Sequence, residues 1–376
     1  MPVTLLLSFL VMLQPVDSLE ALRHAVRSAA PGDRVTLAAG TYSGTLWLEA
    51  IKGAQGKPIV IAGADPADPP VIDGEAECIH LSMCEWVSIE HMILKSATGN
   101  GLNVDDGGNL REPARGIELR SLVVQDIGPD GNCDGIKLSG LRDFKVLECT
   151  IERWGGGGSG IDLVGCAEGV IESCTLRHEA GKGASGIQLK GGTHTVVVRR
   201  CHFEEAGQRA LNIGGSTGLS FFRPEPRGFE ARAIAVEGCT IIGSDAAVAF
   251  VGVDGARVER NTIYNPRRWV LRILQETRQE GFVPSRGGVL SANLVVVDDV
   301  RVLHPNIGDG TDPASFVFER NFWYCATDAK HSTPRLPSPE IEGVYGQDPK
   351  LADPSRGDLR PQAPGVAERV GAASFR

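Results

Sequence analysis

Four copies of one phrase decide the fold of this chain: Gly135-Ile-Lys-Leu138, Gly160-Ile-Asp-Leu163, Gly186-Ile-Gln-Leu189 and Ala210-Leu-Asn-Ile213. Successive copies begin 25, 26 and 24 residues apart. A fixed period in this range is typical of solenoids, in which each repeat buries its apolar face on its neighbours. The units are short and alternating, with Gly-rich turns and no helical pattern of ten residues, so strands are expected to form each coil. The sequence therefore predicts a right-handed parallel β-helix.

The repeat also predicts two series of equivalent residues, one on the outside of the coils and one on the inside. The middle residue of each repeated strand should face outward between two buried neighbours, at His80, Asn103, Lys137, Asp162, Gln188, Asn212, Ala249, Arg272 and Asn306. A second position should form a ladder inside one turn, at His91, Leu122, Cys149, Cys174, Cys201, Cys239, Asn261, Asn293 and Asn321. Stacked strands lie about 4.8 Å apart. The Cβ atoms of a disulfide lie about 3.8 Å apart. The ladder cysteines are therefore expected to be free, buried thiols.

Composition excludes some classes of partner. The chain has 376 residues, 47 of them glycine, and a formal net charge of −9. This charge argues against a nucleic-acid partner, whose binding requires a basic face. Residues 177–209 are locally basic, which suits a bound anion.

The two ends of the chain differ from the repeats. Residues 1–18 are expected to be a signal peptide, because the apolar run Leu5–Leu13 is followed by small residues at Val16-Asp17-Ser18. That run is too short to span a bilayer. We therefore expect the protein to be secreted or periplasmic. We also expect it to be a monomer. Residues 19–325 should form the β-helix, with a capping helix over 19–29, and residues 326–376 a C-terminal cap or tail.

Three stretches together resemble a known family. They are Ala30-Pro-Gly-Asp-Arg-Val-Thr-Leu-Ala-Ala-Gly-Thr-Tyr42, the Gly-Ile-x-Leu repeats, and Asp348-Pro-Lys-Leu-Ala-Asp-Pro-Ser-Arg-Gly-Asp358. Over about residues 19–360 the chain resembles secreted bacterial β-helix proteins of the pectate-lyase-like superfamily, in the style of its alginate and chondroitin lyase branch. The resemblance implies a carbohydrate partner. It does not extend to the Asn-Gly-type lyase motifs, or to the paired-Asp and Gly-His-Gly motifs of pectin hydrolases.

The candidate site lies on the outward row. Lys137, Asp162, Gln188 and Asn212 should stand side by side, with Asp134, Lys190 and Arg209 at the ends of their strands. Two insertions, residues 214–231 and 275–287, should stand beside this row, and long ordered loops are usually functional. A solvated surface without a function would carry polar residues as well.

The mixture of charges suggests β-elimination on an anionic, uronate-containing polysaccharide. This reaction needs a base, and it needs cations that neutralise the carboxylate beside the acidic proton. We expect Lys137 or His178 to be the base and Arg209 to bind the carboxylate. Asp162, Gln188, Lys190, Asn212 and Arg272 would contact the sugars. Asp105, Asp106, Asp130 and Asp134 would hold a Ca²⁺ ion, for which carboxylates are suitable ligands.

Two alternatives stay open. Asp134 and Asp162 could instead be the carboxyl pair of a glycoside hydrolase, which works at a separation of about 5–5.5 Å for retention or 6.5–9.5 Å for inversion. The chain could also be a non-catalytic carbohydrate-binding or surface-structural protein.

Overall fold

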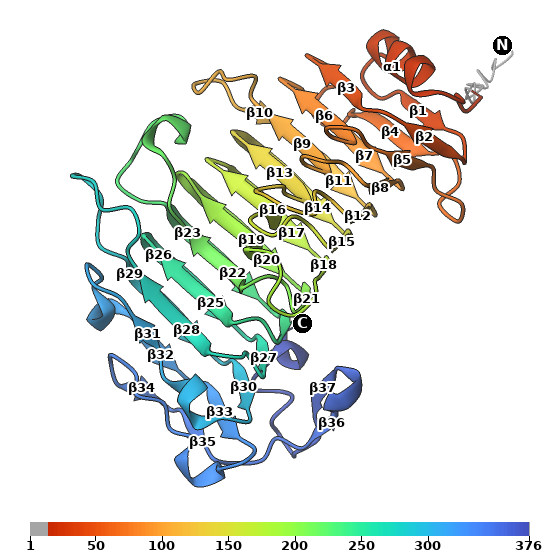
Figure 1. Ribbon diagram of the computed structural model, residues 1–376. Helices are drawn as coiled ribbons and strands as arrows, with labels where there is room; N and C mark the ends of the chain where they lie inside the picture. The colour runs from red at the N-terminus through yellow and green to blue at the C-terminus, as the bar shows by residue number, and fades with distance from the viewer. Residues whose placement is uncertain (1–13, 376) are drawn as a thin grey trace, which may run out of the picture.

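Each coil of the chain contributes short strands to three parallel sheets, so the computed structural model has the predicted right-handed parallel β-helix fold (Figure 1). The structure describes residues 14–375. Consecutive coils stack from the N-terminal to the C-terminal end of the rod, and strands of the same sheet lie side by side.

The three sheets are named A, B and C after the order in which the chain enters them. Sheet A contains β1 (Arg34–Leu37), β4 (Ile59–Gly63), β7 (Val87–Glu90), β11 (Glu118–Arg120), β14 (Leu141–Leu147), β17 (Ala167–Glu172), β20 (Thr193–Arg199), β23 (Ala231–Glu237), β26 (Val253–Glu259), β29 (Arg286–Ser291), β32 (Val317–Glu319) and β34 (Glu340–Ile341), and β10 (Ala114–Arg115) pairs with β14. Sheet B contains β2 (Thr41–Ser43), β5 (Val71–Asp73), β8 (Ile93–Lys95), β12 (Val123–Gln125), β15 (Thr150–Glu152), β18 (Thr175–Arg177), β21 (His202–Glu204), β24 (Thr240–Ile242), β27 (Thr262–Tyr264), β30 (Leu294–Val297), β33 (Phe322–Cys325) and β35 (Val344–Tyr345). Sheet C contains β3 (Leu46–Glu49), β6 (Ile79–Ser82), β9 (Leu102–Asp105), β13 (Ile136–Ser139), β16 (Ser159–Val164), β19 (Ser185–Lys190), β22 (Arg209–Gly214), β25 (Ala246–Val251), β28 (Trp269–Leu274) and β31 (Asn306–Ile307).

A helix closes the N-terminal end of the rod. α1 (Leu19–Ser28) begins after Ser18, whose hydroxyl accepts a hydrogen bond from the Ala21 amide at 3.2 Å, a typical N-cap. Its apolar residues Leu22 and Val26 are buried, and it packs against β1 and β3, as expected of a capping helix. Of the expected signal peptide, residues 1–13 lie outside the described residues.

The outward row of sheet C has the predicted register. Paired residues run from His80 through Asn103, Lys137, Asp162, Gln188, Asn212, Ala249 and Arg272 to Asn306, and Trp47 precedes His80. The flanking residues, such as Ile136 and Leu138, are buried in the core. Alternation along a strand therefore separates the core from the candidate site.

The inner ladder is also present, with one correction. Cys149, Cys174, Cys201 and Cys239 are free and buried, as predicted. The asparagines continue the ladder: the side-chain amide of Asn261 donates to Asn293 at 3.0 Å, that of Asn293 to Asn321 at 2.9 Å, and that of Asn321 to Glu340 at 2.8 Å. His91 was expected in this ladder, but Met92 occupies the position, because Ile93 pairs with Val123.

A left-handed residue precedes each ladder position. Non-glycine residues with positive φ stand there in most coils, for example Glu148 (57°) and Ser173 (55°). This conformation costs about 1–2 kcal/mol for a residue with a Cβ atom. The buried ladder and the strand hydrogen bonds on both sides of the corner offset that cost.

The C-terminal segment folds back along the rod. Sheets A and B continue past residue 325 to β34 and β35, and β36 (Leu351–Asp353) then pairs antiparallel with β37 (Asp358–Pro361). Val366 and Val370 pack against Leu294 and Phe322, so the final residues cover sheet B. Short 3₁₀ turns complete the connections, at η1 (Leu219–Phe221), η2 (Val300–Leu303), η3 (Pro313–Ser315), η4 (Ala329–His331), η5 (Pro354–Arg356) and η6 (Ala372–Ser374).

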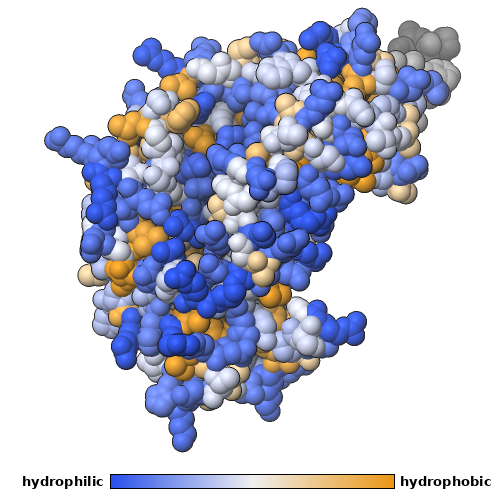
Figure 2. All heavy atoms as spheres, in the orientation of Figure 1, coloured by the Kyte–Doolittle hydropathy of each residue, from blue (hydrophilic) through white to orange (hydrophobic). Residues whose placement is uncertain are grey.

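The surface of the rod is polar. On the face drawn in Figure 2, hydrophilic residues cover most of the area and hydrophobic residues form scattered patches. None of the helices in residues 14–375 has the length and apolar character needed to cross a membrane.

The ladder makes the fold sensitive to charge. Cys174→Asp should lower the free energy of unfolding by several kcal/mol, on the order of 3–5, because it buries a carboxylate without a partner. Gln188→Ala on the outer face should cost at most about 1 kcal/mol. Urea unfolding of both variants measures the difference, and equal losses would contradict the assignment of inner and outer positions.

Candidate functional site

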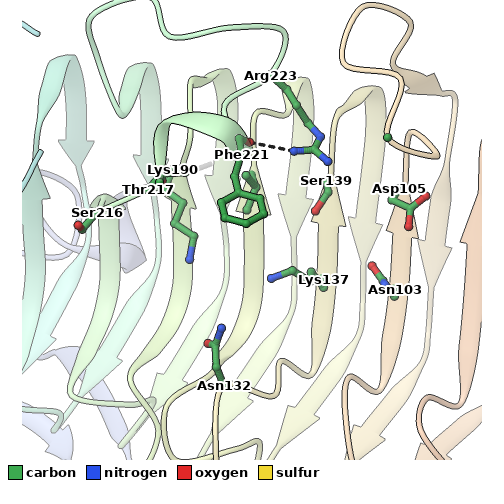
Figure 3. A pocket seen from close by; sticks show the side chains of 13 residues that line it. Asn103, Asp105, Asn132, Lys137, Ser139, Lys190, Ser216, Thr217, Phe221 and Arg223 are labelled. Atoms are coloured by element: carbon green, nitrogen blue, oxygen red, sulfur yellow. Dashed lines mark hydrogen bonds between the residues drawn. The ribbon is translucent and has the colours of Figure 1, made fainter. Parts of the chain in front are cut away.

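A groove of about 520 Å³ lies on the outer face of sheet C, beside the C-terminal ends of β13, β16 and β19 (Figure 3). The residues lining it are Asn103, Asp105, Gly108, Asn132, Lys137, Ser139, Val164, Lys190, Ser216, Thr217, Gly218, Phe221 and Arg223. The floor comes from the outward row and the ends of its strands, and the walls come from loops. One of these loops is the insertion 214–231, which stands beside the row as the sequence predicted.

Four charged side chains form the centre of the site, and we call them the charge cluster: Asp134, Lys137, Asp162 and Lys190. The Nζ atom of Lys137 lies 2.9 Å from Oδ2 of Asp134 and 2.8 Å from Oδ2 of Asp162. Nζ of Lys190 lies 3.1 Å from Oδ1 of Asp162. The two carboxylate side chains are 1% exposed, whereas those of Lys137 and Lys190 are 25% and 18% exposed. The carboxylates thus form an inner layer, and the ammonium groups lie between them and the groove.

Strand register explains this cluster. Lys137 and Asp162 are paired neighbours on β13 and β16, and Asp134 stands three residues before Lys137 in the preceding turn. The remaining oxygen of Asp134 accepts the Ser159 amide at 2.7 Å, which fixes the carboxylate at the start of β16. Hydrogen bonds and ion pairs therefore satisfy a buried charge that would otherwise be costly.

The cluster keeps Lys137 protonated. Burial alone would lower the pKa of its amine, but the charges of Asp162 and Asp134 outweigh burial and raise the pKa above its usual value. Burial and the charge of Asp162 raise the pKa of Asp134. A base must be neutral near the working pH, so this geometry does not favour the base role expected of Lys137. The Lys137 side chain is also held by the two carboxylates and does not extend freely into solvent.

His178 is not suited to the same role. Its Nε2 lies 2.8 Å from the Trp154 carbonyl oxygen and donates to it, and its Nδ1 accepts the Glu179 amide at 2.7 Å. Burial lowers the pKa of His178, so the ring is neutral, yet both nitrogens are engaged. The ring packs edge-on against Trp154 and does not line the groove.

The remaining expected sugar contacts continue the row beyond the groove. Arg209 donates to Asn212 at 3.2 Å and pairs with Glu276 of the second insertion at 2.8 Å. Arg272 donates to Asn306 at 3.0 Å and lies over the ring of Trp269, 4.3 Å from its centroid. These residues, like Gln188, belong to the same face but not to the lining of the groove. Of the expected sites, only Lys137, Lys190 and Asp105 line it directly.

The four aspartates expected to bind calcium do not form one site. Asp105 lies 2.8 Å from His80, Asp106 pairs with Arg223 at 2.7 Å, and Asp134 pairs with Lys137. Asp130 belongs to the turn before β13. Within residues 14–375, no group of three or more His, Cys, Asp or Glu residues is arranged to hold a metal ion. The residues present therefore do not fit the expected calcium site.

A second ionic network adjoins the groove at its N-terminal end. The ring nitrogens of His80 lie 2.6 Å from Glu77 and 2.8 Å from Asp105, and the ring stacks on Trp47 with centroids 3.9 Å apart. Burial alone would lower the pKa of His80, but the hydrogen bonds to Asp105 and Glu77 raise it to about 9. His80 is therefore an imidazolium ion at neutral pH, and it orients the Asp105 carboxylate that lines the groove.

A buried carboxylate ties the two insertions together. Glu230 is fully buried and accepts hydrogen bonds from the Gly191 amide at 2.8 Å, the Thr217 amide at 2.8 Å and hydroxyl at 2.7 Å, and the Thr277 hydroxyl. The rings of Phe222 and Phe282 meet edge-on, with centroids 5.5 Å apart. Both insertions project from the same side of the rod, so they form one continuous wall (Figure 1).

Arg223 joins this wall to a second loop beside the groove. From the insertion 214–231 it reaches loop 106–113, where its Nε lies 2.7 Å from the nearly buried Asp106 carboxylate. Its Nη1 donates to the Phe221 carbonyl oxygen at 2.8 Å, as Figure 3 shows. This contact spans 117 residues of sequence and ties the insertion 214–231 to loop 106–113.

Three side chains in or beside this site were not predicted from the sequence. Phe221, 62% exposed, and Arg223 lie in the insertion that the sequence singled out without assigning its side chains. Trp47 belongs to the same row as His80, one coil earlier than the first coil counted. In the sequence, the available signal for the first two was an aromatic residue and an arginine close together within a long insertion.

Removal of Lys137 should destabilise the fold as well as the site. Lys137→Met leaves Asp134 and Asp162 buried without their shared partner, so the free energy of unfolding at pH 7 should fall by about 3–5 kcal/mol. Part of this loss should be recovered near pH 5, because an unpaired buried carboxyl takes up a proton readily. Urea unfolding at both pH values measures it. A variant as stable as wild type at pH 7 would show that the buried carboxylates do not depend on Lys137.

The His80 network predicts a specific pH dependence of stability. The pKa of His80 is raised from 6.5 to about 9, so its contribution should be complete below pH 6.5 and lost as the pH rises through 9. The difference in unfolding free energy between wild type and His80→Gln should therefore shrink by about 1–3 kcal/mol between pH 6.5 and 9.5. His331→Gln, at an exposed histidine, is the control. A difference that stays constant with pH would contradict the charged network.

Comparisons with known proteins agree with this architecture. Residues 77–223 match a family model described as a right handed beta helix region. An alginate lyase from Paenibacillus sp. str. FPU-7 is 18% identical with a TM-score of 0.56, covering 88% of this chain and 97% of the lyase. A mannuronic acid specific polysaccharide family 6 lyase from human gut microbiota is 14% identical with a TM-score of 0.54, covering 87% and 80%. Pectate lyase Pel9A is 12% identical with a TM-score of 0.51, covering 78% and 73%.

A search of curated proteins gives no significant match. At these identities the structural likeness concerns the fold. The chain is a right-handed parallel β-helix protein with the fold of pectate and alginate lyases.

Proposed function

We propose that this protein binds an anionic, uronate-containing polysaccharide in the groove and cleaves it by β-elimination. The observation that carries the proposal is the arrangement of Lys137 and Lys190, whose ammonium groups share Asp162 and lie at the floor of the groove. Export beyond the cytoplasmic membrane, expected from residues 1–18, suits a polymeric substrate.

The two ammonium groups retain donors for a substrate carboxylate. An ammonium has three N–H donors. Lys137 directs two of them to Asp134 and Asp162. Lys190 directs one to the Gln188 side-chain oxygen at 3.4 Å, and its charge pairs with Asp162 at 3.1 Å. The remaining donors can turn to an anion in the groove, where charge-assisted hydrogen bonds are short and strong. A uronate carboxylate at this point would be held by two cations.

This placement suits the chemistry of elimination. Elimination passes the proton beside the uronate carboxylate to a base, breaks the C–O bond to the neighbouring sugar and returns a proton to the departing oxygen. Asp105 is the carboxylate that lines the groove and is our candidate base, and solvent supplies the proton to the departing oxygen. Loss of the first proton builds negative charge onto the uronate carboxylate, and fixed positive groups lower the barrier. We assign Lys137 and Lys190 to this neutralisation, in place of the base role first expected of Lys137. Arg223 at the wall adds a third cation, already oriented by Asp106.

Phe221 gives the groove an apolar surface. Its ring is 62% exposed at the edge of the site, although most large apolar side chains of the protein are buried. The ring carries an apolar face that can pack on the C–H groups of a pyranose ring. We therefore assign Phe221 to sugar binding.

The glycoside hydrolase alternative has one specific observation in its favour. Burial and the charge of Asp162 raise the pKa of Asp134, and a hydrolase needs one carboxyl that holds its proton to act as the general acid. Lys137 lies between them, however, and both carboxylates are 1% exposed. This occupancy of the space between the carboxyls favours elimination.

Incubation with polygalacturonate, alginate and chondroitin tests the proposal. Elimination leaves an unsaturated sugar that absorbs ultraviolet light, whereas hydrolysis leaves only a new reducing end. We expect an absorbing product from at least one polymer. Lys190→Met should lower kcat/KM roughly 100-fold or more, because one neutralising cation is lost while Lys137 still pairs with Asp162. Phe221→Ala should chiefly raise KM.

A matched control uses Arg257→Gln, a charge removed from the exposed face of sheet A. It should leave turnover unchanged. New reducing ends without absorbance would establish hydrolysis instead, and binding without either product would establish a carbohydrate-binding protein.

A further inference from the structure

A second pocket, of about 320 Å³, lies at the corner between sheets C and A, and we call it the arginine pocket. Gly140 and Gly165 line it, and they directly follow Ser139 and Val164 of the groove. Arg223 lines both pockets, so they adjoin at its ion pair with Asp106. The basic side chains of the arginine pocket are Arg111, Arg115, Arg142, Arg223, Arg227 and His194.

The positive charge of this pocket is poorly compensated. Asp106 is the one carboxylate that lines it, and Arg223 occupies that carboxylate at 2.7 Å. Arg115 and Arg142 have distant partners, Glu85 at 3.7 Å and Glu168 at 3.8 Å. Across residues 14–375, neither Arg111 nor Arg227 has an ion pair with a carboxylate.

The pKa of His194 reflects the same excess of positive charge. Burial lowers its pKa, and the positive charges of Arg227 and Arg142 lower it further. The histidine is therefore neutral beside the arginines. Its neutral ring can donate one hydrogen bond without adding to the charge.

We infer that the arginine pocket binds a second anionic group of the polysaccharide whose uronate occupies the groove. Guanidinium groups present rigid, paired N–H donors that match oxyanions such as carboxylate and sulfate. The inference rests on the proposed function in that both anions belong to one polymer. It goes further because it restricts the substrate to polymers with a second acidic group close to the cleaved residue.

Two chemical sources could supply that anion, a sulfate ester or the carboxylate of another uronate. Both would face the same guanidinium groups. The distinction matters for the identity of the substrate, because a sulfate site indicates a sulfated uronate polymer and a carboxylate site a plain polyuronate.

Calorimetric titration of the full-length protein can test the pocket. The ligands are short oligomers of galacturonate, of chondroitin sulfate, and of chondroitin sulfate from which the sulfate has been removed. The test variant is Arg142→Gln with Arg227→Gln, since both arginines line the pocket and are solvent-exposed. Arg257→Gln with Arg301→Gln removes the same net charge from exposed sites outside both pockets and is the matched control.

The test variant should bind at least one oligomer about tenfold more weakly or worse, while the control binds it as wild type does. A loss confined to the sulfated oligomer identifies a sulfate ester, and a loss for all oligomers identifies a carboxylate. Equal affinities of test and control variants for every oligomer would overturn the inference, as would a wild-type protein that binds none of them. Weaker binding by the test variant together with no ultraviolet-absorbing product would leave the inference standing and reject elimination alone.

Discussion

The structure depends on one constraint, the stacking of equivalent residues at the spacing of parallel strands, about 4.8 Å. Inside the rod, this spacing places small or hydrogen-bonding side chains above one another, as in the ladder from Cys149 to Asn321. On the outer face of sheet C it places Lys137 beside Asp162. Like charges at this separation would repel, and the cations of the row are not direct neighbours: Asn103 lies between His80 and Lys137, and Asp162 follows Lys137. The same constraint therefore organises both the core and the site.

The walls of the groove depend on interactions that cross long stretches of sequence. Glu230 holds the two insertions together from a fully buried position, and Arg223 bridges to Asp106 of loop 106–113. A buried carboxylate with four donors is stable only while those donors stay in place. These contacts hold the loops to one another, so a ligand in the groove would meet a wall that is already ordered.

The two charged regions beside the groove differ in how their charge is balanced. In the charge cluster, buried carboxylates balance Lys137 and Lys190 and also orient them toward the groove. In the arginine pocket this balance is incomplete, because Asp106, the one carboxylate that lines it, pairs with Arg223 and no ion pair within residues 14–375 holds Arg111 or Arg227. The protein as a whole is acidic, with a net charge of −9, so the positive arginine pocket is a local exception. A polyanion would be repelled by most of the surface and attracted to this corner of the rod.

The sequence by itself determined the fold, the outward row and the inner thiols, because all three depend on a local period that repeats along the chain. Only Met92, in place of His91, departs from the predicted ladder, because Ile93 pairs with Val123 and the residue before it takes the ladder position. The roles of the site residues were decided by the tertiary structure. Whether Lys137 is free or paired depends on a carboxylate one coil away, and His178 is engaged by the Trp154 carbonyl oxygen. The four aspartates are separated by partners as distant as Arg223, 117 residues from Asp106. A periodic pattern fixes which residues stack, whereas charge states depend on contacts between segments that no period relates.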